Sequence, residues 1–558
     1  MLRSLPVPMG ATETTDPEWL QSIEGAVDSA FTNLTVWFDT VLFWAPDFFP
    51  MPWIVAWLLV GAIVITIYLG FPQLRGVGLA WKVVRGNFSS PDDPGEIPHY
   101  QALTSAVSGT VGLGNIAGVG AAVVMGGPGA TFWMILAGIL GMATKFAECT
   151  LGVKYREIRA DGTVSGGPFK YLPVAFTKFP KFLSVGLTGA FAIAILLFGV
   201  AGGNMFQSNQ TYAQLVQVTG GENSPFVALA WQFGVGLIIA AIIGAVIIGG
   251  MKSIGRVTST LVPFMGGIYV LACLFVILSN IGQVPSAVVA IVGGAFSPEA
   301  VAGGFLGALI VGLQRSAFSN EAGLGSAPIA HSTVKTRRPV SEGFVALFEP
   351  FIDTVIVCTM TALTIIIADT QFYNDAREGY FNGDPAADGV VVTSESFESA
   401  IGWFPYLLAL AVALFAISTL ITWSYYGQRA WAYLFNDSKT SVTIYRGVFL
   451  LFTVMGCVLS FGQLIDFTNV ILFLCAFINL LGVYFLLPVI KREMKEYWAD
   501  YRSGKLYELG KLDADKEIAV EELAEANQVR DDSGQNRLAD PDDDGFGAGG
   551  ATTPRDRR

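Results

Sequence analysis

Apolar stretches recur along the chain from Trp53 to Ile490, and short polar loops separate them. Each stretch is about 20 residues long, the length that a helix needs to cross a bilayer core. We therefore predict an all-α membrane protein with eleven transmembrane helices. They lie near Trp53–Phe71, Thr104–Met125, Thr131–Val153, Leu183–Gln207, Ala228–Gly249, Thr258–Ser279, Val301–Ser326, Phe344–Ala368, Trp403–Tyr426, Gly447–Phe461 and Ile465–Ile490.

Basic residues are concentrated in alternate loops. Lys154 and Arg156 follow the third predicted helix, and Arg337 and Arg338 follow the seventh, whereas the loop at 369–400 is acidic with a single Arg. Cytoplasmic loops of membrane proteins carry the excess of Lys and Arg. The odd-numbered helices therefore end in the cytoplasm, which places the N-terminus outside and the C-terminus inside.

Two Gly-Leu-Gly segments interrupt predicted helices, at 112–114 and 323–325. Polar residues precede both segments, at 104–110 and 316–322. A broken helix leaves backbone N–H and C=O groups without partners, and lipid cannot satisfy them. Paired interruptions in two halves of a membrane protein indicate the substrate site of a secondary transporter.

The two interrupted helices enter the membrane from opposite sides. Without the first helix, the other ten divide into five and five, and each set of five begins with an interrupted helix. This arrangement predicts an inverted repeat with a site near the midplane. The predicted divisions are an extracellular segment (1–51), an extra helix with its loop (52–99), the two repeats (100–282 and 283–492) and an acidic, mostly disordered cytoplasmic tail (493–558).

The first break offers groups of both signs to a ligand. The N–H groups of Leu113, Gly114 and Asn115 begin the next half-helix, and a helix N-terminus favours a carboxylate. Freed carbonyls around Ser108 and Val111 suit a hard cation such as sodium. The alternative is that these small residues only allow close helix packing.

Ionisable residues surround the second break, where Arg315 precedes Glu321. Such groups cost at least about 2.5 kcal/mol each inside a bilayer and therefore need partners. Glu349 and Asp353 in the following helix are candidates. An internal ion pair and a role in ion coupling both remain open.

Other polar side chains lie in apolar helices. Lys145 and Glu148 are three residues apart, so we expect them to pair with each other. The hydroxyls of Ser418 and Thr419 either bond back to their own helix or complete a sodium shell begun by the freed carbonyls. Gln207 is expected to face the cavity.

The chain lacks the residues that most enzymes use. It has two histidines, and its five cysteines lie in apolar segments, so neither a zinc centre nor a histidine-based catalytic triad is expected. We expect no enzyme activity, no cofactor beyond a co-transported sodium ion and no nucleic-acid partner. A channel would need a continuous polar lining and a sensor a folded signalling domain, and the sequence indicates neither.

Several motifs resemble the alanine or glycine:cation symporter family over roughly Tyr100 to Arg492. They are Gly109–Val119, Gly126–Ala130, Gly141–Glu148, Gly166–Pro168, Phe318–Pro328 and Trp423–Gly427.

The resemblance implies the leucine-transporter-type fold, sodium coupling and small neutral amino acids as substrates. It implies substrate contacts at Thr110, Gly112, Leu113, Gly114, Asn115, Gln207, Phe318, Ser319 and Trp423. Backbone groups at 113–114 and the Gln207 side chain would meet the substrate carboxylate. Sodium would lie at the carbonyls of Ser108 and Val111 and the hydroxyls of Ser418 and Thr419. Relatives often have Thr or Ser where this chain has Leu113, so backbone contacts alone are expected there.

The expected function is sodium-coupled import of alanine or glycine, or both, across the plasma membrane by alternating access. One alternative is a transporter of the same fold with another coupling cation or another small neutral amino acid. A substrate sensor or a channel is the remaining alternative, from a different class. The sequence does not predict the oligomeric state.

Overall fold

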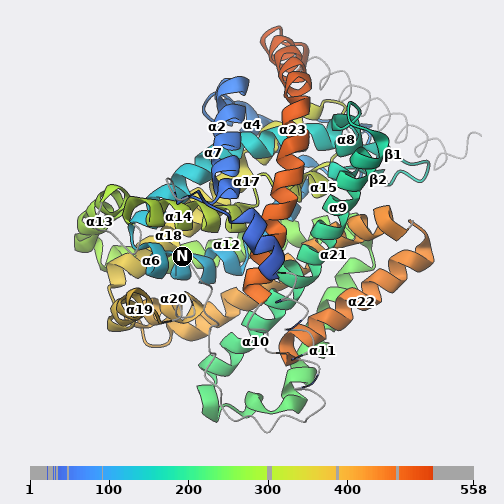
Figure 1. Ribbon diagram of the computed structural model, residues 1–558. Coiled ribbons are helices and arrows are strands. Elements are labelled where there is room, and N and C mark those ends of the chain that lie inside the picture. The colour runs from blue at the N-terminus through green and yellow to red at the C-terminus, as the bar shows by residue number, and fades with distance from the viewer. Residues whose placement is uncertain are drawn as a thin grey trace, which may run out of the picture.

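The computed structural model describes residues 35–46, 50–90, 92–297, 304–384, 389–435, 437–459 and 464–506, with isolated positions between 22 and 32. The chain is built almost entirely from helices (Figure 1). Most of the predicted N-terminal segment and, from residue 507, the predicted tail lie outside the described residues.

Among the described residues, eight helices are long and apolar enough to cross a membrane, and one bent pair makes a ninth candidate. The chain is therefore a multi-pass membrane protein. The eight are α7 (Gly129–Lys154), α9–α10 (Lys181–Val218), α11 (Leu229–Ile247), α12 (Gly250–Ser279), α16–α18 (Pro339–Ala368), α21 (Phe404–Phe435), α22 (Lys439–Val458) and α23 (Leu464–Arg502). The bent pair is α5 (His99–Thr110) with α6 (Ala117–Gly126).

Two further helices, α2 (Trp53–Leu69) and α14 (Gly304–Asn320), have 17 residues each and lie over the first and seventh predicted spans. A helix thus lies at every predicted position, although several bounds differ. The prediction that the tail begins at residue 493 is wrong for 493–502, because α23 continues to Arg502.

Shorter elements connect these helices. A two-residue strand β1 (Glu157–Ile158) pairs antiparallel with β2 (Val164–Ser165) in the loop after α7. The short helices are α3 (Pro72–Arg75), α4 (Val77–Val84), α8 (Pro168–Ala175), α13 (Val284–Phe296), α15 (Ala327–His331), α19 (Gln371–Asn382) and α20 (Gly389–Glu398).

The first break is a sharp bend. α5 ends at Thr110, a 3₁₀ turn follows over Leu113–Asn115, and α6 leaves at 59° to α5. Gly112 is in an extended conformation that any residue adopts. A glycine is needed here because a side chain would not fit: a Cβ would lie 2.8 Å from Thr419 Oγ1.

The second break depends on left-handed backbone. It lies between α14 and α15, and its residues Glu321, Gly323 and Gly325 have φ of 55°, 95° and 86°. Glycine adopts this region without steric cost, whereas a residue with a Cβ does so rarely. The two glycines therefore allow the backbone to leave helical geometry between α14 and α15.

Two helices organise the interior. α7 packs against α2, α14 and α16, while α21 packs against α5, α9 and α10. The long helix α23 runs along much of the molecule, with α2 beside it (Figure 1). α7 and α21 therefore belong to two different groups of packed helices, and α21 is the one of the two that packs along α5.

Two helical segments widen to π-helix, at Ala201–Met205 before α10 and at Phe351–Cys358 between α17 (Phe348–Pro350) and α18 (Thr359–Ala368). Such segments are rare and occur frequently at functional sites. Nothing in the hydrophobic pattern of the sequence predicts them.

Two glycines of α6 offer a test of this packing. A Cβ at Gly120 would meet the backbone of Gly389 in α20, including its Cα at 2.9 Å, whereas a Cβ at Gly118 would meet nothing within 4 Å. Gly120→Ala should lower the thermal midpoint of the purified protein, since overpacking costs about 1–3 kcal/mol. Gly118→Ala should leave the midpoint unchanged or raise it. Equal midpoints for the two variants would contradict the close approach of α6 and α20.

Candidate functional site

The two breaks lie against each other in the interior. Asn115 Nδ2 in the first break donates to Ser319 Oγ at the end of α14, at 3.1 Å. A Cβ at Gly114 would lie 3.3 Å from the ring of Phe318. Segments separated by about 200 residues therefore form one site, as a paired-break transporter requires.

A cavity of about 290 Å³ lies at this junction. Glycines, aromatic rings and a few polar groups form its wall. The lining residues are Gly109, Thr110, Gly112, Gly114, Phe198, Gly202, Gln207, Phe318, Glu321, Thr419 and Trp423.

Six of the nine residues predicted to contact substrate line this cavity. They are Thr110, Gly112, Gly114, Gln207, Phe318 and Trp423. Leu113, Asn115 and Ser319 do not line it. Their side chains are buried in the protein, where those of Asn115 and Ser319 form the hydrogen bonds described below.

The first break has two free N–H groups, and one of them belongs to Gly114, which lines the cavity. Among the described residues, no acceptor meets the backbone N–H of Leu113 or Gly114. The N–H of Gly112, by contrast, donates to Asn115 Oδ1 at 2.9 Å. The free donors lie just before α6, whose N-terminus adds partial positive charge.

Gln207 presents a free acceptor instead. Its Nε2 donates to the carbonyl of Gly202 at 3.1 Å, while its Oε1 is buried with no partner among the described residues. A buried amide oxygen without a donor is costly. Because Gly202 fixes the nitrogen, the free atom accepts a hydrogen bond and does not donate one.

Glu321 places a second acceptor in the cavity wall. One of its carboxylate oxygens accepts from Ser326 Oγ at 2.5 Å. The left-handed backbone at Glu321 turns the chain at the end of α14. The sequence showed an acidic residue in the break but not that it would line the cavity.

Aromatic rings set the size of the cavity. The Trp423 indole Nε1 donates to the carbonyl of Gly109 at 3.2 Å, and its ring packs between Phe198 at 4.7 Å and Tyr426 at 5.1 Å between centroids. Phe318 contacts Phe206 edge to face. The indole is therefore held by a hydrogen bond and two ring contacts, and moving it to widen the cavity would disrupt them.

The residues predicted to bind sodium lie together. Ser418 Oγ and Thr419 Oγ1 are 3.4 and 3.2 Å from the carbonyl oxygen of Ser108, and Ser108 Oγ donates to the carbonyl of Ser418 at 2.7 Å. The carbonyl of Val111, just after α5, has no donor among the described residues. These oxygens join α5 to α21, and oxygen is the donor that hard cations prefer.

A buried carboxylate holds the two breaks together. Asp353, in the second π-helix, accepts from Asn115 Nδ2 at 2.7 Å, from Ser319 Oγ at 2.5 Å and from Thr354 Oγ1 at 2.8 Å. These contacts explain why Asn115 and Ser319 turn away from the cavity. Asp353 was expected to pair with a charged residue, but its direct partners here are neutral.

The other predicted ion pairs also differ. Lys145 Nζ bonds Glu349 Oε1 at 2.7 Å, so its expected pairing with Glu148 is wrong. Glu148 instead accepts from Asn479, which also donates to the carbonyl of Gly323 at 2.8 Å. Asn479 in α23 thereby satisfies a carbonyl freed by the second break.

A larger space of about 480 Å³ lies between α2, α7 and α14. Apolar side chains such as Val55, Leu59 and Leu313 form most of its wall, and no charged residue lines it. Convergent polar groups mark a ligand site better than volume does. The cavity at the breaks is therefore the candidate site.

Comparison with known proteins finds solved structures at low sequence identity and curated proteins at higher identity. The solved structure of MhsT in complex with L-phenylalanine is 15% identical, with a TM-score of 0.45, and covers 71% of this chain and 97% of that one. The sodium/alanine symporter AgcS of Methanococcus maripaludis is 35% identical over 80% of this chain and 94% of its own length. The probable sodium/glutamine symporter GlnT of Bacillus subtilis is 34% identical over 80% of this chain and 88% of its own.

A model of the sodium:alanine symporter family matches residues 35–510, which contain both breaks, the cavity and the oxygen cluster between α5 and α21. These relatives are transporters, not enzymes. With this match over most of its length, the chain belongs to the sodium:alanine symporter family.

Proposed function

We propose that this protein imports alanine or glycine, or both, together with sodium across the plasma membrane by alternating access. The observation that carries the proposal is the cavity between the two breaks. It combines a free backbone donor at Gly114 with the free acceptor Gln207 Oε1 and the carboxylate of Glu321. A zwitterionic amino acid with a short side chain carries the complementary groups.

The substrate carboxylate would bind at the first break. The N–H groups of Leu113 and Gly114 point from the start of a half-helix, and charge-assisted hydrogen bonds of this kind are the strong ones. Recognition by backbone groups does not need a hydroxyl at position 113. The leucine found there is thus compatible with substrate binding.

The substrate ammonium would bind to acceptors on the opposite wall. Gln207 offers a free Oε1, and Glu321 offers a carboxylate in the same cavity. This assignment gives Gln207 the ammonium and not the carboxylate that the family resemblance implied. The reason is that the amide oxygen is the atom without a partner among the described residues, while the amide nitrogen already donates one of its two hydrogens to Gly202.

The substrate side chain would face Phe198, Phe318 and Trp423. Because Trp423 is held by a hydrogen bond and two ring contacts, a larger side chain would have to displace a packed ring. A methyl group or a hydrogen needs no such change. This supports alanine and glycine over larger neutral amino acids.

Sodium would bind the carbonyls of Ser108 and Val111 with the hydroxyls of Ser418 and Thr419. In that position it links α5 to α21, next to the cavity that Thr419 also lines. A cation there would stabilise one arrangement of α5 relative to α21. Substrate would then complete the closure, and the helices carrying both breaks would rock against the remaining helices.

The proposed architecture is the leucine-transporter type, with eleven spans and two inverted repeats of five after the first helix. Loop charges support an extracellular N-terminus and a cytoplasmic C-terminus. The basic loop with β1 and β2 then lies in the cytoplasm.

The main alternative is the same fold with another cation or another small neutral amino acid. A relative in Bacillus subtilis, 32% identical over 75% of this chain, is named a putative sodium/proton-dependent alanine carrier, and GlnT is named for glutamine. Glutamine would have to extend past the fixed Trp423 ring. Cation competition and substrate competition distinguish these alternatives.

Uptake into proteoliposomes tests the function. Labelled alanine and glycine should accumulate with an inward sodium gradient, and neither lithium nor a proton gradient should replace it. One charge moved through 100 mV is worth about 2.3 kcal/mol, enough for a roughly 50-fold gradient. Accumulation without sodium would rule out sodium coupling, and uptake of glutamine in preference to alanine would rule out the substrate assignment.

The sodium site predicts different effects of two threonines on one helix. Thr419 and Thr422 both bond carbonyls of α5, but only Thr419 lines the cavity. Thr419→Val should raise the sodium concentration for half-maximal uptake about tenfold or more, because a contact to a charged group is lost. Thr422→Val, the matched control, should leave this concentration nearly unchanged. Equal sodium dependence of the two variants would remove Thr419 from the site.

The ammonium assignment predicts a loss of affinity at Gln207. Gln207→Leu should raise the KM for alanine about tenfold or more, since a buried charge would lose an acceptor. Gln214, also buried in α10 but outside the cavity wall, provides the control Gln214→Leu. An unchanged KM in Gln207→Leu, with normal expression of both variants, would place the ammonium elsewhere.

A further inference from the structure

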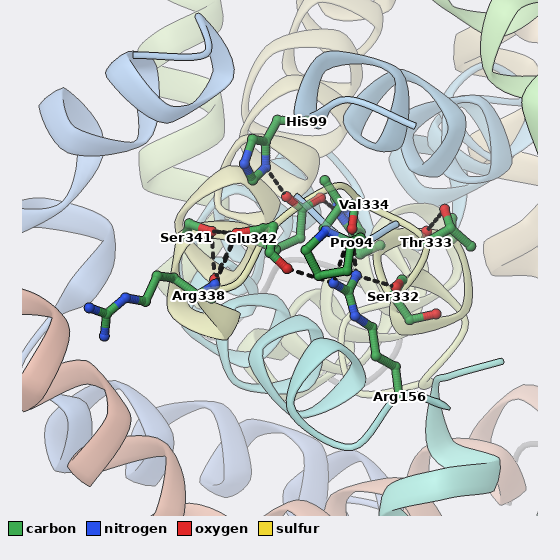
Figure 2. A network of polar contacts seen from close by, with 12 residues as sticks. Pro94, His99, Arg156, Ser332, Thr333, Val334, Arg338, Ser341 and Glu342 are labelled. Atoms are coloured by element: carbon green, nitrogen blue, oxygen red, sulfur yellow. Dashed lines mark hydrogen bonds and ion pairs between the residues drawn. The ribbon is translucent and has the colours of Figure 1, made fainter. Parts of the chain in front are cut away.

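The two histidines of the chain meet at one carboxylate, outside the cavity. Glu342 Oε1 lies 2.5 Å from His331 Nδ1, and Glu342 Oε2 contacts His99 Nδ1. Figure 2 shows His99 directed at Glu342. All three side chains are buried. The proposed transport mechanism uses none of them.

A second carboxylate faces the other nitrogen of His331. His331 Nε2 and Glu349 Oε2 are 3.5 Å apart, and neither atom has a hydrogen-bond partner among the described residues. That separation is too short for an intervening water. Without a hydrogen on Nε2, two buried lone pairs would face each other.

The arrangement requires a hydrogen on each imidazole nitrogen of His331. Each imidazole nitrogen of His331 faces a carboxylate oxygen, and both nitrogens are donors only in the imidazolium form. The other oxygen of Glu349 bonds Lys145 Nζ at 2.7 Å. With a charged His331, the cations Lys145 and His331 balance the anions Glu342 and Glu349.

The groups around His331 include charges of both signs. Arg156 acts electrostatically on Glu342 from the loop after α7, while Cys149 from α7 and Tyr426 from α21 lie within range of Glu349. Two further carboxylates, Glu148 and Glu321, interact with Lys145 and are hydrogen-bonded to the neutral Asn479 and Ser326. Uncompensated buried charge is strongly destabilising. A network with this many carboxylates therefore gains from one bound proton.

The network joins elements that the transport mechanism requires to move together. His99 is the first residue of α5 and His331 the last of α15, so Glu342 in α16 links the far ends of both broken helices. Glu349 in α17 and Lys145 in α7 extend the chain of contacts. Both broken helices and two of their neighbours are thus connected through the two histidines and two carboxylates.

Backbone contacts and an arginine hold the same ends in register. A parallel bridge pairs Ile97 with Val334, and Lys335 N–H donates to the carbonyl of Ile97 at 2.7 Å. Arg156 donates to the carbonyls of Pro94, Ser332, Val334 and Thr336 at 2.5–2.8 Å (Figure 2). Burial lowers the pKa of Arg156 to about 10, which leaves it charged at neutral pH. The charged Arg156 side chain lies between this network and the basic loop after α7.

We propose that His331, Glu342 and Glu349 form a proton-binding site, and that the bound proton, carried by the His331 imidazole, holds the two broken helices and their neighbours together at one end. Release breaks the N–H bond at Nδ1 and passes the proton, by way of Glu342 Oε1, to water on the Arg156 side, with no other bond changed. The consequence for transport rests on the proposed function, which makes that side cytoplasmic. Alkaline cytoplasm should then slow transport.

Nitrogen NMR tests the site without any transport assay. The full chain, labelled with ¹⁵N-histidine and held in lipid nanodiscs, should give signals from two imidazoles, and His99→Asn assigns them. His331 should show the imidazolium pattern, with two protonated nitrogens, at pH 7.5, about one unit above the pKa of a free histidine. Glu349→Gln should abolish that pattern. A neutral His331 at pH 7.5 in the unmodified chain would overturn the proposal.

Uptake at controlled internal pH tests the consequence. With sodium and external pH held constant, raising the internal pH should slow alanine uptake, by up to about tenfold per pH unit beyond proton release. His331→Asn and Glu349→Gln, either of which removes the site, should lose this dependence even if their uptake is slower overall. A pH profile that is identical in both variants and the unmodified chain would overturn the coupling of the proton to transport. Absence of sodium-driven uptake at every pH would instead contradict the proposed function and leave the NMR result intact.

Discussion

The central constraint on this protein is that a bilayer offers no partner to an unpaired backbone group. Two helices are nevertheless interrupted in its interior, and the structure satisfies their freed groups in three ways. Some are met by side chains, as when Asn115 accepts from Gly112 and Asn479 donates to Gly323. Others are met by hydroxyls from α21 at the carbonyl of Ser108. The remainder, at Leu113, Gly114 and Val111, stay available beside the cavity, which is where the proposed cargo binds.

The breaks are also held to each other. Asp353 accepts hydrogen bonds from one residue of each break, and its position in a π-helix brings its carboxylate between them. Removing it would leave Asn115 and Ser319 as buried donors without that acceptor, which costs about 1–3 kcal/mol for each group. Asp353 thus acts as a positioning residue for both halves of the cavity. The proton site proposed at His331 plays a similar part at the opposite end of the same broken helices.

Both interruptions and a helix at each predicted position are found in the structure, because hydrophobic runs and glycine interruptions are local signals. The freed carbonyl of Ser108 and the hydroxyls of Ser418 and Thr419 suggested a shared site as one of two alternatives, and the structure brings these residues together. Side-chain direction was less predictable. Leu113, Asn115 and Ser319 flank the cavity in sequence, yet their side chains turn into the protein, two of them toward Asp353.

Pairing of buried charges was the least predictable feature. Lys145 and Glu148 are close in sequence, but Lys145 bonds Glu349, about 200 residues away. The free atom of Gln207 depends on the contact of its amide nitrogen with Gly202, which a π-helix brings within reach. The Lys145 pairing follows from how the helices pack, and the Gln207 contact follows from the π-helix before α10. No spacing rule along the chain contains that information.

Sodium and amino acid should bind cooperatively, because Thr419 belongs to the proposed sodium site and also lines the cavity. The most direct test is equilibrium binding of labelled alanine to the purified protein at several sodium concentrations, with the reciprocal titration of sodium at several alanine concentrations. The proposed mechanism predicts that sodium raises the affinity for alanine at least about fivefold. Binding linkage then requires alanine to raise the affinity for sodium by the same factor. Alanine affinity that does not change with sodium would contradict it.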